Sequence, residues 1–175
     1  RQFVEEFDVS NGFNLFNANG IEATQQRLKE IVAVGEVLAK KYEVVVTNPP
    51  YMGASNLSTK VSEVIKKKYP DSKADLFAVF IERCAELTNL NGLQAMITQH
   101  AWMFLSSFEK LRAQIINRDI VNMAHLGARA FEEIGGEVVQ TTSFVFRNSS
   151  LRNLNGKYCR LIDADSQNAK EEMYL

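Results

Sequence analysis

The stretch Tyr42-Glu43-Val44-Val45-Val46-Thr47-Asn48-Pro49-Pro50-Tyr51 decides the fold. Its first six residues are a short, largely apolar run, which is typical of a β-strand. The two prolines end that strand, because neither has a backbone N–H to donate to a sheet. The residue before each proline is pushed towards an extended backbone, so the segment beyond the strand is stiff and non-helical. The pattern therefore predicts an amide side chain, backbone carbonyls and an aromatic ring in fixed relation at a strand end.

Helices are predicted where apolar residues recur at helical spacing, in residues 24–41, 58–69 and 73–90. The last of these has the widest apolar stripe, made of Leu76, Phe77, Phe80, Ile81, Cys84 and Leu87. Asn91 and Gly92 follow it as a stop signal. The second helix carries Val61, Val64 and Ile65 on one side.

A fourth helix is predicted to open with a capping box formed by Ser106 and Glu109 and to end near residue 117. Phe108, Leu111 and Ile115 would face inward from it. Strands are predicted for residues 43–47, 93–98, 119–126, 137–147 and 157–162, with a further short strand around residues 3–9 and a loop over 10–20. The tail from residue 163 shows no strong structural signal.

Strand, helix, strand, helix, strand, strand is the order expected for the second half of an α/β sheet. The continuous apolar character of residues 43–47 indicates a parallel strand covered by helices on both faces. The first three strands have the helical crossovers that parallel neighbours need. Residues 119–126 and 137–147 have no helix between them, so this terminal pair can run antiparallel.

Composition places the chain among soluble globular proteins: it has 175 residues, of which 46% are hydrophobic and 23% charged. The formal net charge of −1 gives no global basic field, although a basic surface can still be local. Cys84 and Cys159 lie far apart without metal-ligand spacing, and Cys84 falls on an apolar helix face, which favours a buried reduced thiol and a cytoplasmic setting.

No apolar run reaches the roughly 18 residues that a membrane span requires. The chain begins at Arg1 and goes directly into polar sequence. We therefore expect a single partial domain, residues 1–175, from a longer protein.

The chemistry is expected at the tetrad, because ligands of open α/β sheets bind outside the carboxyl ends of the strands. The side-chain oxygen of Asn48 and the carbonyl of Pro49 are acceptors that do not titrate near neutral pH. Such a pair suits an –NH₂ group and favours positive charge that develops on its nitrogen during nucleophilic attack. Tyr51 offers a flat face for stacking, a contact worth about 1–3 kcal/mol for a nucleic-acid base. Together they predict a site for an exocyclic amine on a planar heterocycle.

Asn-Pro-Pro-Tyr after an apolar strand resembles the catalytic motif of the DNA adenine amino-methyltransferases. Later segments resemble further motifs of that family: residues 74–82 (Ala-Asp-Leu-Phe-Ala-Val-Phe-Ile-Glu), 98–104 (Thr-Gln-His-Ala-Trp-Met-Phe), 124–127 (Ala-His-Leu-Gly), Phe131, and 139–146 (Val-Gln-Thr-Thr-Ser-Phe-Val-Phe). Residues 42–53 and 94–147 are most similar to the PglX family, the large methyltransferases of the BREX phage-defence systems. The implied fold is the C-terminal half of a Rossmann-like, S-adenosylmethionine-dependent methyltransferase sheet.

The resemblance implies that Asn48, Pro49, Pro50 and Tyr51 are the catalytic tetrad. Asn48 and Pro49 would accept hydrogen bonds from the target amino group, and Tyr51 would stack on the base. Phe131 would cover the other face of an adenine flipped out of double-stranded DNA, because chemistry on a base within a duplex requires its extrusion.

The resemblance also implies that Phe80 lies near the adenine of S-adenosylmethionine and that Asp75 helps to shape that pocket. Phe77 and Phe80 are equally at the spacing of plain core residues, so that alternative stays open. The glycine-rich cofactor motif and the acidic residue for the ribose are absent, and Gly12 and Gly20 do not replace them. The module that reads the DNA sequence is absent too, so we expect the chain alone to be inactive and to bind cofactor weakly or not at all.

Some residues keep two interpretations. Residues 66–68, three consecutive lysines, either favour the C-terminus of their helix or contact phosphate. His100 and Trp102 are more often structural, and a metal role for His100 and His125 has almost no support from their spacing.

The sequence therefore predicts methyl transfer from S-adenosylmethionine to an adenine amine, with other phage-defence proteins as further partners. Alternatives are the methylase part of a fused restriction–modification enzyme and a non-catalytic, methylase-like scaffold that binds DNA or a partner.

Overall fold

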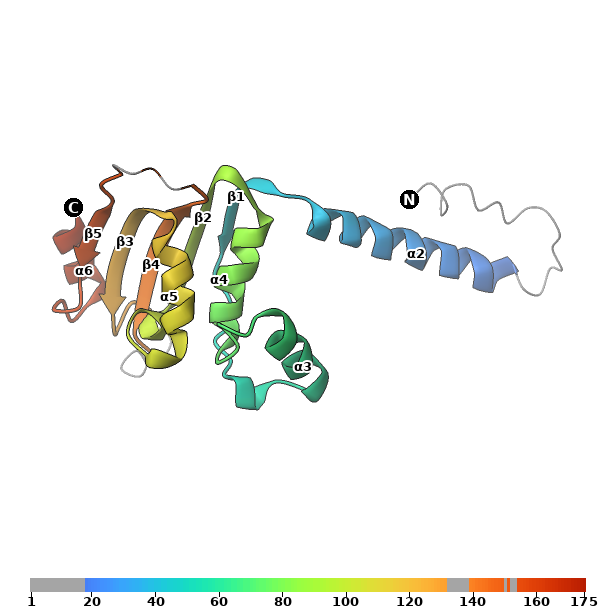
Figure 1. Cartoon of the computed structure of the whole chain (residues 1–175), viewed down its shortest axis with the longest axis horizontal. Coiled ribbons are helices and arrows are strands. Elements are labelled where there is room, and N and C mark those ends of the chain that lie inside the picture. The colour runs from blue at the N-terminus through green and yellow to red at the C-terminus, as the bar shows by residue number, and fades with distance from the viewer. Residues whose placement is uncertain (1–17, 132–138, 150, 152–153) are drawn as a thin grey trace. The chain divides into compact units, whose positions relative to one another are not determined.

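A computed structural model describes residues 18–131, 139–149, 151 and 154–175 (Figure 1). The strand predicted around residues 3–9 lies outside this range. The chain divides into two compact units, residues 1–40 and 41–175. In the first, α2 spans Ala18–Ala39. This confirms the helix predicted over 24–41, but the helix begins earlier than predicted, so residues 18–20 of the predicted loop are helical. No helix among the described residues combines the length and apolarity that a bilayer crossing would need.

The second unit is built on a five-stranded mixed sheet in the order β1-β2-β4-β3-β5. Its strands are β1 Tyr42–Thr47, β2 Thr88–Gln99, β3 Asp119–Gly127, β4 Thr141–Arg147 and β5 Lys157–Arg160. β1 runs parallel to β2, and β3 runs parallel to β5. β4 lies between β2 and β3 and is antiparallel to both, which confirms the predicted antiparallel pair.

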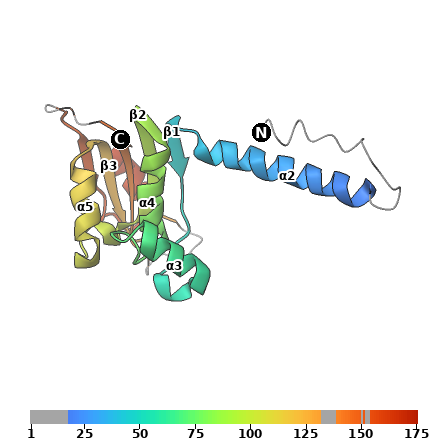
Figure 2. The same ribbon diagram turned by 45° about the vertical axis from the view of Figure 1, so that its right-hand side comes forward.

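α4 (Leu76–Leu87) and α5 (Glu109–Ile116) cover one face of this sheet, as Figures 1 and 2 show. The core between them and the sheet contains Phe77, Ile81, Cys84, Met96, Trp102, Phe108, Leu111, Ile115, Phe144 and Phe146. The predicted inward residues of α5 and the buried thiol of Cys84 are thereby confirmed. Within the core the rings of Phe144 and Phe146 stack with centroids 4.2 Å apart.

The expectation that both faces of the first strand are covered is wrong for the described residues. Val44 and Val46 are 55% and 71% exposed, whereas Val45 packs against the core. Successive residues of a strand point to opposite faces of the sheet. Only one face of β1, an edge strand, lies under α4.

The helix predicted over residues 73–90 is α4, but it ends at Leu87 and β2 begins at once. Asn91 and Gly92 are therefore not a helix stop. Asn91 adopts φ 65°, and a Cβ on Gly92 would lie 2.8 Å from the Glu43 carbonyl oxygen. The pair occupies an irregularity in β2, where the register to β1 shifts, and the strand thus starts earlier than predicted.

Three other details differ from the sequence-based expectation. α3 is Thr59–Lys68 as predicted, but only Ile65 of its apolar side is buried; Val61 and Val64 are exposed. The predicted capping box is wrong, because residues 106–108 form a 3-10 turn (η3) and α5 begins without a side-chain cap. β4 begins at Thr141 instead of residue 137, since residues 139–140 are outside the strand.

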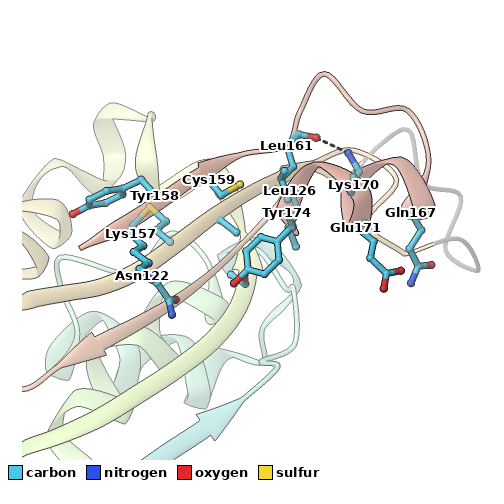
Figure 3. Close-up of a pocket in the computed structure, with 14 residues that line it drawn as sticks. Asn122, Leu126, Lys157, Tyr158, Cys159, Leu161, Gln167, Lys170, Glu171 and Tyr174 are labelled. Carbon is cyan, nitrogen blue, oxygen red and sulfur yellow. Dashed lines mark hydrogen bonds between the residues drawn. The ribbon is translucent and has the colours of Figure 1, made fainter. Parts of the chain in front are cut away.

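The tail, for which no structure was predicted, forms α6 (Gln167–Tyr174). Ser166 caps it by accepting a hydrogen bond from the Ala169 amide at 3.2 Å. The buried Lys170 ammonium donates to the Leu161 carbonyl at 2.9 Å, the bond drawn in Figure 3, and to the Ala164 carbonyl at 2.6 Å. These contacts attach the helix beside β5. They depend on the fold, so the composition of the tail did not predict the helix.

Candidate functional site

The Asn-Pro-Pro-Tyr tetrad lies where the sequence predicts it, directly after β1 at a carboxyl strand end. β2 is parallel to β1, and β2 and β3 are both antiparallel to β4. The carboxyl ends of β1, β2 and β3 therefore share one edge of the sheet. Asn48 and Pro50 are exposed at this edge, Pro49 is buried and Tyr51 is half-buried. The amide of Asn48 is thus accessible to a ligand while its proline neighbour is fixed by packing.

Asp75 anchors the loop that follows the tetrad. Its Oδ1 accepts hydrogen bonds from the Met52 amide at 3.1 Å and from the Phe77 amide at 3.3 Å. Asp75 is thereby also the N-cap of α4. The Leu76 amide returns a bond to the Met52 carbonyl at 2.9 Å. One carboxylate therefore links the tetrad loop to the first turn of a core helix.

Tyr51 has a buried polar group without a partner. Its ring meets that of Phe77 edge-on, with centroids 6.2 Å apart and planes at 84°. Its hydroxyl is buried and has no hydrogen-bond partner among the described residues. Burial raises the pKa of this phenol, so it is neutral at physiological pH. An unpaired buried hydroxyl is unfavourable by about 1–3 kcal/mol.

The two phenylalanines of α4 differ in exposure. Phe77 is 1% exposed and belongs to the core, as one of the two sequence interpretations held. Phe80 packs against the same core but is only partly buried. It thus keeps an accessible portion, and its contact with a cofactor stays a prediction.

Phe131 lies on the loop that leaves β3 at the edge shared with the tetrad. β3 ends at Gly127, whose φ of 68° belongs to the left-handed region that glycine tolerates. A Cβ at Gly127 would lie 2.9 Å from a side-chain carbon of Ile162, so a larger residue does not fit where the chain leaves β3. Arg129, further along, donates to the Asp165 carbonyl at 3.2 Å. Phe131 itself is partly exposed.

The family model of the Eco57I restriction-modification methylases matches residues 3–131. This chain belongs to that family. It is 53% identical over 151 residues to the adenine-specific methyltransferase PglX of Lacticaseibacillus casei (strain Zhang), covering 86% of this chain and 13% of that protein. It is 44% identical over 138 residues to the adenine-specific methyltransferase BrxX of Escherichia coli O9:H4 (strain HS), covering 78% and 12%. The chain thus spans only a small part of these curated relatives.

Two solved structures show that the family fold is present here. The Type ISP restriction-modification enzyme LlaGI, in complex with a DNA substrate mimic, matches with a TM-score of 0.58 at 16% identity over 87% of this chain and 17% of that one. A Listeria monocytogenes protein assigned to the class I S-adenosylmethionine-dependent methyltransferases gives a TM-score of 0.51 at 14% identity, over 78% and 42%. The chain therefore has part of the class I methyltransferase sheet.

Sequence reasoning did not find the contact between the two histidines. His100 follows β2 and His125 lies in β3, and their Nδ1 and Nε2 atoms are 2.8 Å apart. Phe104 packs on both rings, with centroid distances of 5.2 and 5.5 Å. The histidines are 25 residues apart, and no local spacing signals that they meet. In the described part of the chain no cluster of three or more His, Cys, Asp or Glu residues could hold a metal ion.

The lysine run at the end of α3 keeps both of its interpretations. Lys68 lies 3.7 Å from the Glu86 carboxylate and 5.2 Å from the Tyr69 ring centroid. Lys66 and Lys67 are exposed in the last helical turn, where positive charge favours the helix C-terminus.

A separate cavity of about 970 Å³ lies between β3, β5 and α6 (Figure 3). Its strand residues include the paired Ser143, Ala124 and Cys159. β1 and β5 are the two outermost strands of the sheet, on opposite sides of it, so this cavity is distinct from the tetrad.

Proposed function

We propose that this chain is the C-terminal half of the catalytic domain of a site-specific DNA adenine methyltransferase. The enzyme would act in the cytoplasm on double-stranded DNA, as a PglX-like component of a BREX phage-defence system. The observation that carries the proposal is the Asn-Pro-Pro-Tyr tetrad at the carboxyl end of β1 in a methyltransferase sheet, with Asn48 exposed. The family membership and the two adenine-specific relatives support it.

In this proposal the tetrad binds and orients the target amine. The Asn48 side-chain oxygen and the Pro49 carbonyl accept the two amino protons, which directs the nitrogen lone pair and stabilises the positive charge that develops on it. Pro50 holds the backbone extended so that both acceptors converge. Bound S-adenosylmethionine would supply the methyl group, with the new N–C bond replacing its S–C bond, and the surplus proton would leave the amine for solvent. No covalent intermediate with the protein is needed.

Two aromatic rings would hold the flipped adenine. Tyr51 would stack on one face, and its unpaired hydroxyl would gain a polar partner from the bound nucleotide. Phe131 would cover the other face from the loop after β3. Stacking of this kind contributes about 1–3 kcal/mol per base.

Phe80 of α4 and Asp75, its N-cap, fit the cofactor to different degrees. Phe80, partly exposed on the core helix, would border the adenine of S-adenosylmethionine. Asp75 already accepts two backbone amides through Oδ1, so it would shape the pocket wall by fixing the tetrad loop to α4. The remaining cofactor contacts would come from outside this chain.

A second candidate is the methylase part of a fused restriction–modification enzyme. The family description and the likeness to the LlaGI fold favour it. Both candidates share the methyl transfer, and assaying the intact protein for DNA cleavage separates them. A non-catalytic scaffold is the remaining alternative, and it predicts no methylation at all.

The test is Asn48→Ala in the intact protein, with host DNA sequenced for N6-methyladenine. We expect loss of methylation at the enzyme's site, because one of the two acceptors for the amine is removed. Asn155→Ala is the matched control, since Asn155 is an exposed asparagine in the turn before β5. Undiminished methylation by the Asn48 variant would refute the assignment, and absence of methylation in the wild type would favour the scaffold.

A further inference from the structure

The His100–His125 pair spans the sheet at the edge that carries the tetrad. His100 directly follows β2 and His125 belongs to β3, and these strands are not neighbours, because β4 lies between them. Their 2.8 Å contact therefore crosses over the beginning of β4. Phe104, 59% exposed, packs against both imidazoles and shields their contact on one side.

This pair is attached to β3 shortly before Phe131 and to the residue that precedes β4. His125 lies two residues before Gly127, the last residue of β3. The backbone amide of His100 donates to the Gln140 carbonyl at 2.9 Å, next to the first residue of β4. His100 thus contacts Gln140 through its backbone and His125 through its ring.

We propose that His100 and His125 are positioning residues that fix the carboxyl end of β3 relative to β2. They would set where the Phe131 ring, four residues after β3, stands over the flipped base, and the inference rests on the proposed function. Neither histidine touches the reacting atoms in this proposal. Their effect passes through Gly127 and residues 128–131 to the base.

The imidazole contact depends on protonation because it needs one N–H donor and one nitrogen lone pair. A neutral pair and a singly protonated pair both provide these, whereas a doubly protonated pair brings two N–H groups and two charges together. Burial lowers the pKa of both histidines from the ordinary 6.5, and His100, Arg160 and Lys170 lower that of His125 further. The bond is therefore intact above pH 6.5 and is lost as the pH falls well below it.

The charged groups around the pair are cationic. Arg160 of β5 and Lys170 of α6 act on His125, and Arg160 is itself paired with Asp163 at 2.8 Å. η2, the 3-10 turn His100–Met103, and the following Phe104 bring no other charge. No carboxylate of the described residues is hydrogen-bonded to either ring. His125, Arg160 and Tyr158 also line a hollow of about 530 Å³.

The test compares alanine variants, amide variants and one control variant of the intact protein. His100→Ala and His125→Ala remove the bond, and we expect kcat/KM for DNA to fall about tenfold, the effect of one hydrogen bond to a neutral partner. His100→Asn and His125→Gln place an amide near the bonding nitrogen without a titrating group. The double amide variant should keep wild-type activity at neutral pH and lose the decline below pH 6.5. Gln140→Ala, which leaves the backbone carbonyl in place, is the matched control.

The outcomes separate the two proposals. If the wild type methylates, Asn48→Ala does not, and the alanine variants keep wild-type kcat/KM, the positioning role is wrong and the function stands. The role also fails if the double amide variant folds but is as impaired as the alanine variants, or keeps the acid decline. If the wild type never methylates, the proposed function fails. Ring ¹⁵N spectra then test the histidine contact by itself. Independent titration of the two imidazoles with pH would overturn it, and two coupled titration steps would support it.

Discussion

Replacement of Asp75 by alanine should loosen the tetrad loop and the start of α4 together. The carboxylate accepts from the Phe77 amide as an N-cap, and loss of such a cap costs about 1 kcal/mol. It also accepts from the Met52 amide in an exposed position, which adds about 0.5–1 kcal/mol. We expect the free energy of unfolding to fall by about 1.5–2 kcal/mol, since both amides lose the same acceptor.

The assay is thermal and urea unfolding of the chain, followed by far-UV circular dichroism. A loss of this size corresponds to a decrease in Tm of about 5–8 °C for a unit of this length. Asp75→Ser separates the two bonds, because serine is a good N-cap but is too short to keep the Met52 amide as well. It should recover about 1 kcal/mol. The reasoning is wrong if Asp75→Ala unfolds within about 0.5 kcal/mol of the wild type, or if serine recovers nothing.

Three further predictions concern other described residues. Tyr51→Phe should leave the free energy of unfolding unchanged or higher, since the buried hydroxyl has no partner; a decrease above about 1 kcal/mol in urea would contradict this. Lys170→Ala should leave the Leu161 and Ala164 carbonyls without their donor and release α6, which hydrogen exchange would show as lost protection of residues 167–174; unchanged protection would count against these bonds. Calorimetry of the isolated chain with S-adenosylmethionine should show no micromolar binding, and such binding would overturn the proposed incompleteness of the cofactor site.

The type and order of the main elements followed from the sequence because hydrophobic periodicity determines them. β1, β3 and α3 coincide closely with the predicted segments, and α4 lies within the helix predicted over 73–90. The Asn91-Gly92 pair was misinterpreted, because such a pair suits a helix end and a strand irregularity equally well. The choice between them depends on Glu43 of a different strand, which no local pattern includes.

The parts of the site that could be predicted are those encoded in contiguous residues. Two prolines after an apolar run indicate the tetrad. The dual bonding of Asp75 and the contact of His100 with His125 join segments 23 and 25 residues apart, so they emerge only with the fold. α6 was not predicted for a similar reason: it is attached by buried Lys170, whose contact with the Leu161 carbonyl forms only in the folded chain.

The position of β4 also bears on the order in which the protein folds. β2 and β3 have no edge in common, so until β4 has been synthesised they cannot join one sheet. β1 and β2 can pair earlier, with α4 as their crossover. β4 then pairs Arg147 with both Leu93 and Asp119, closing contacts between distant parts of the chain, which is slow by comparison with local pairing. On a ribosome, the strand that presents the tetrad would thus be in place before β3, which leads to Phe131, joins the same sheet.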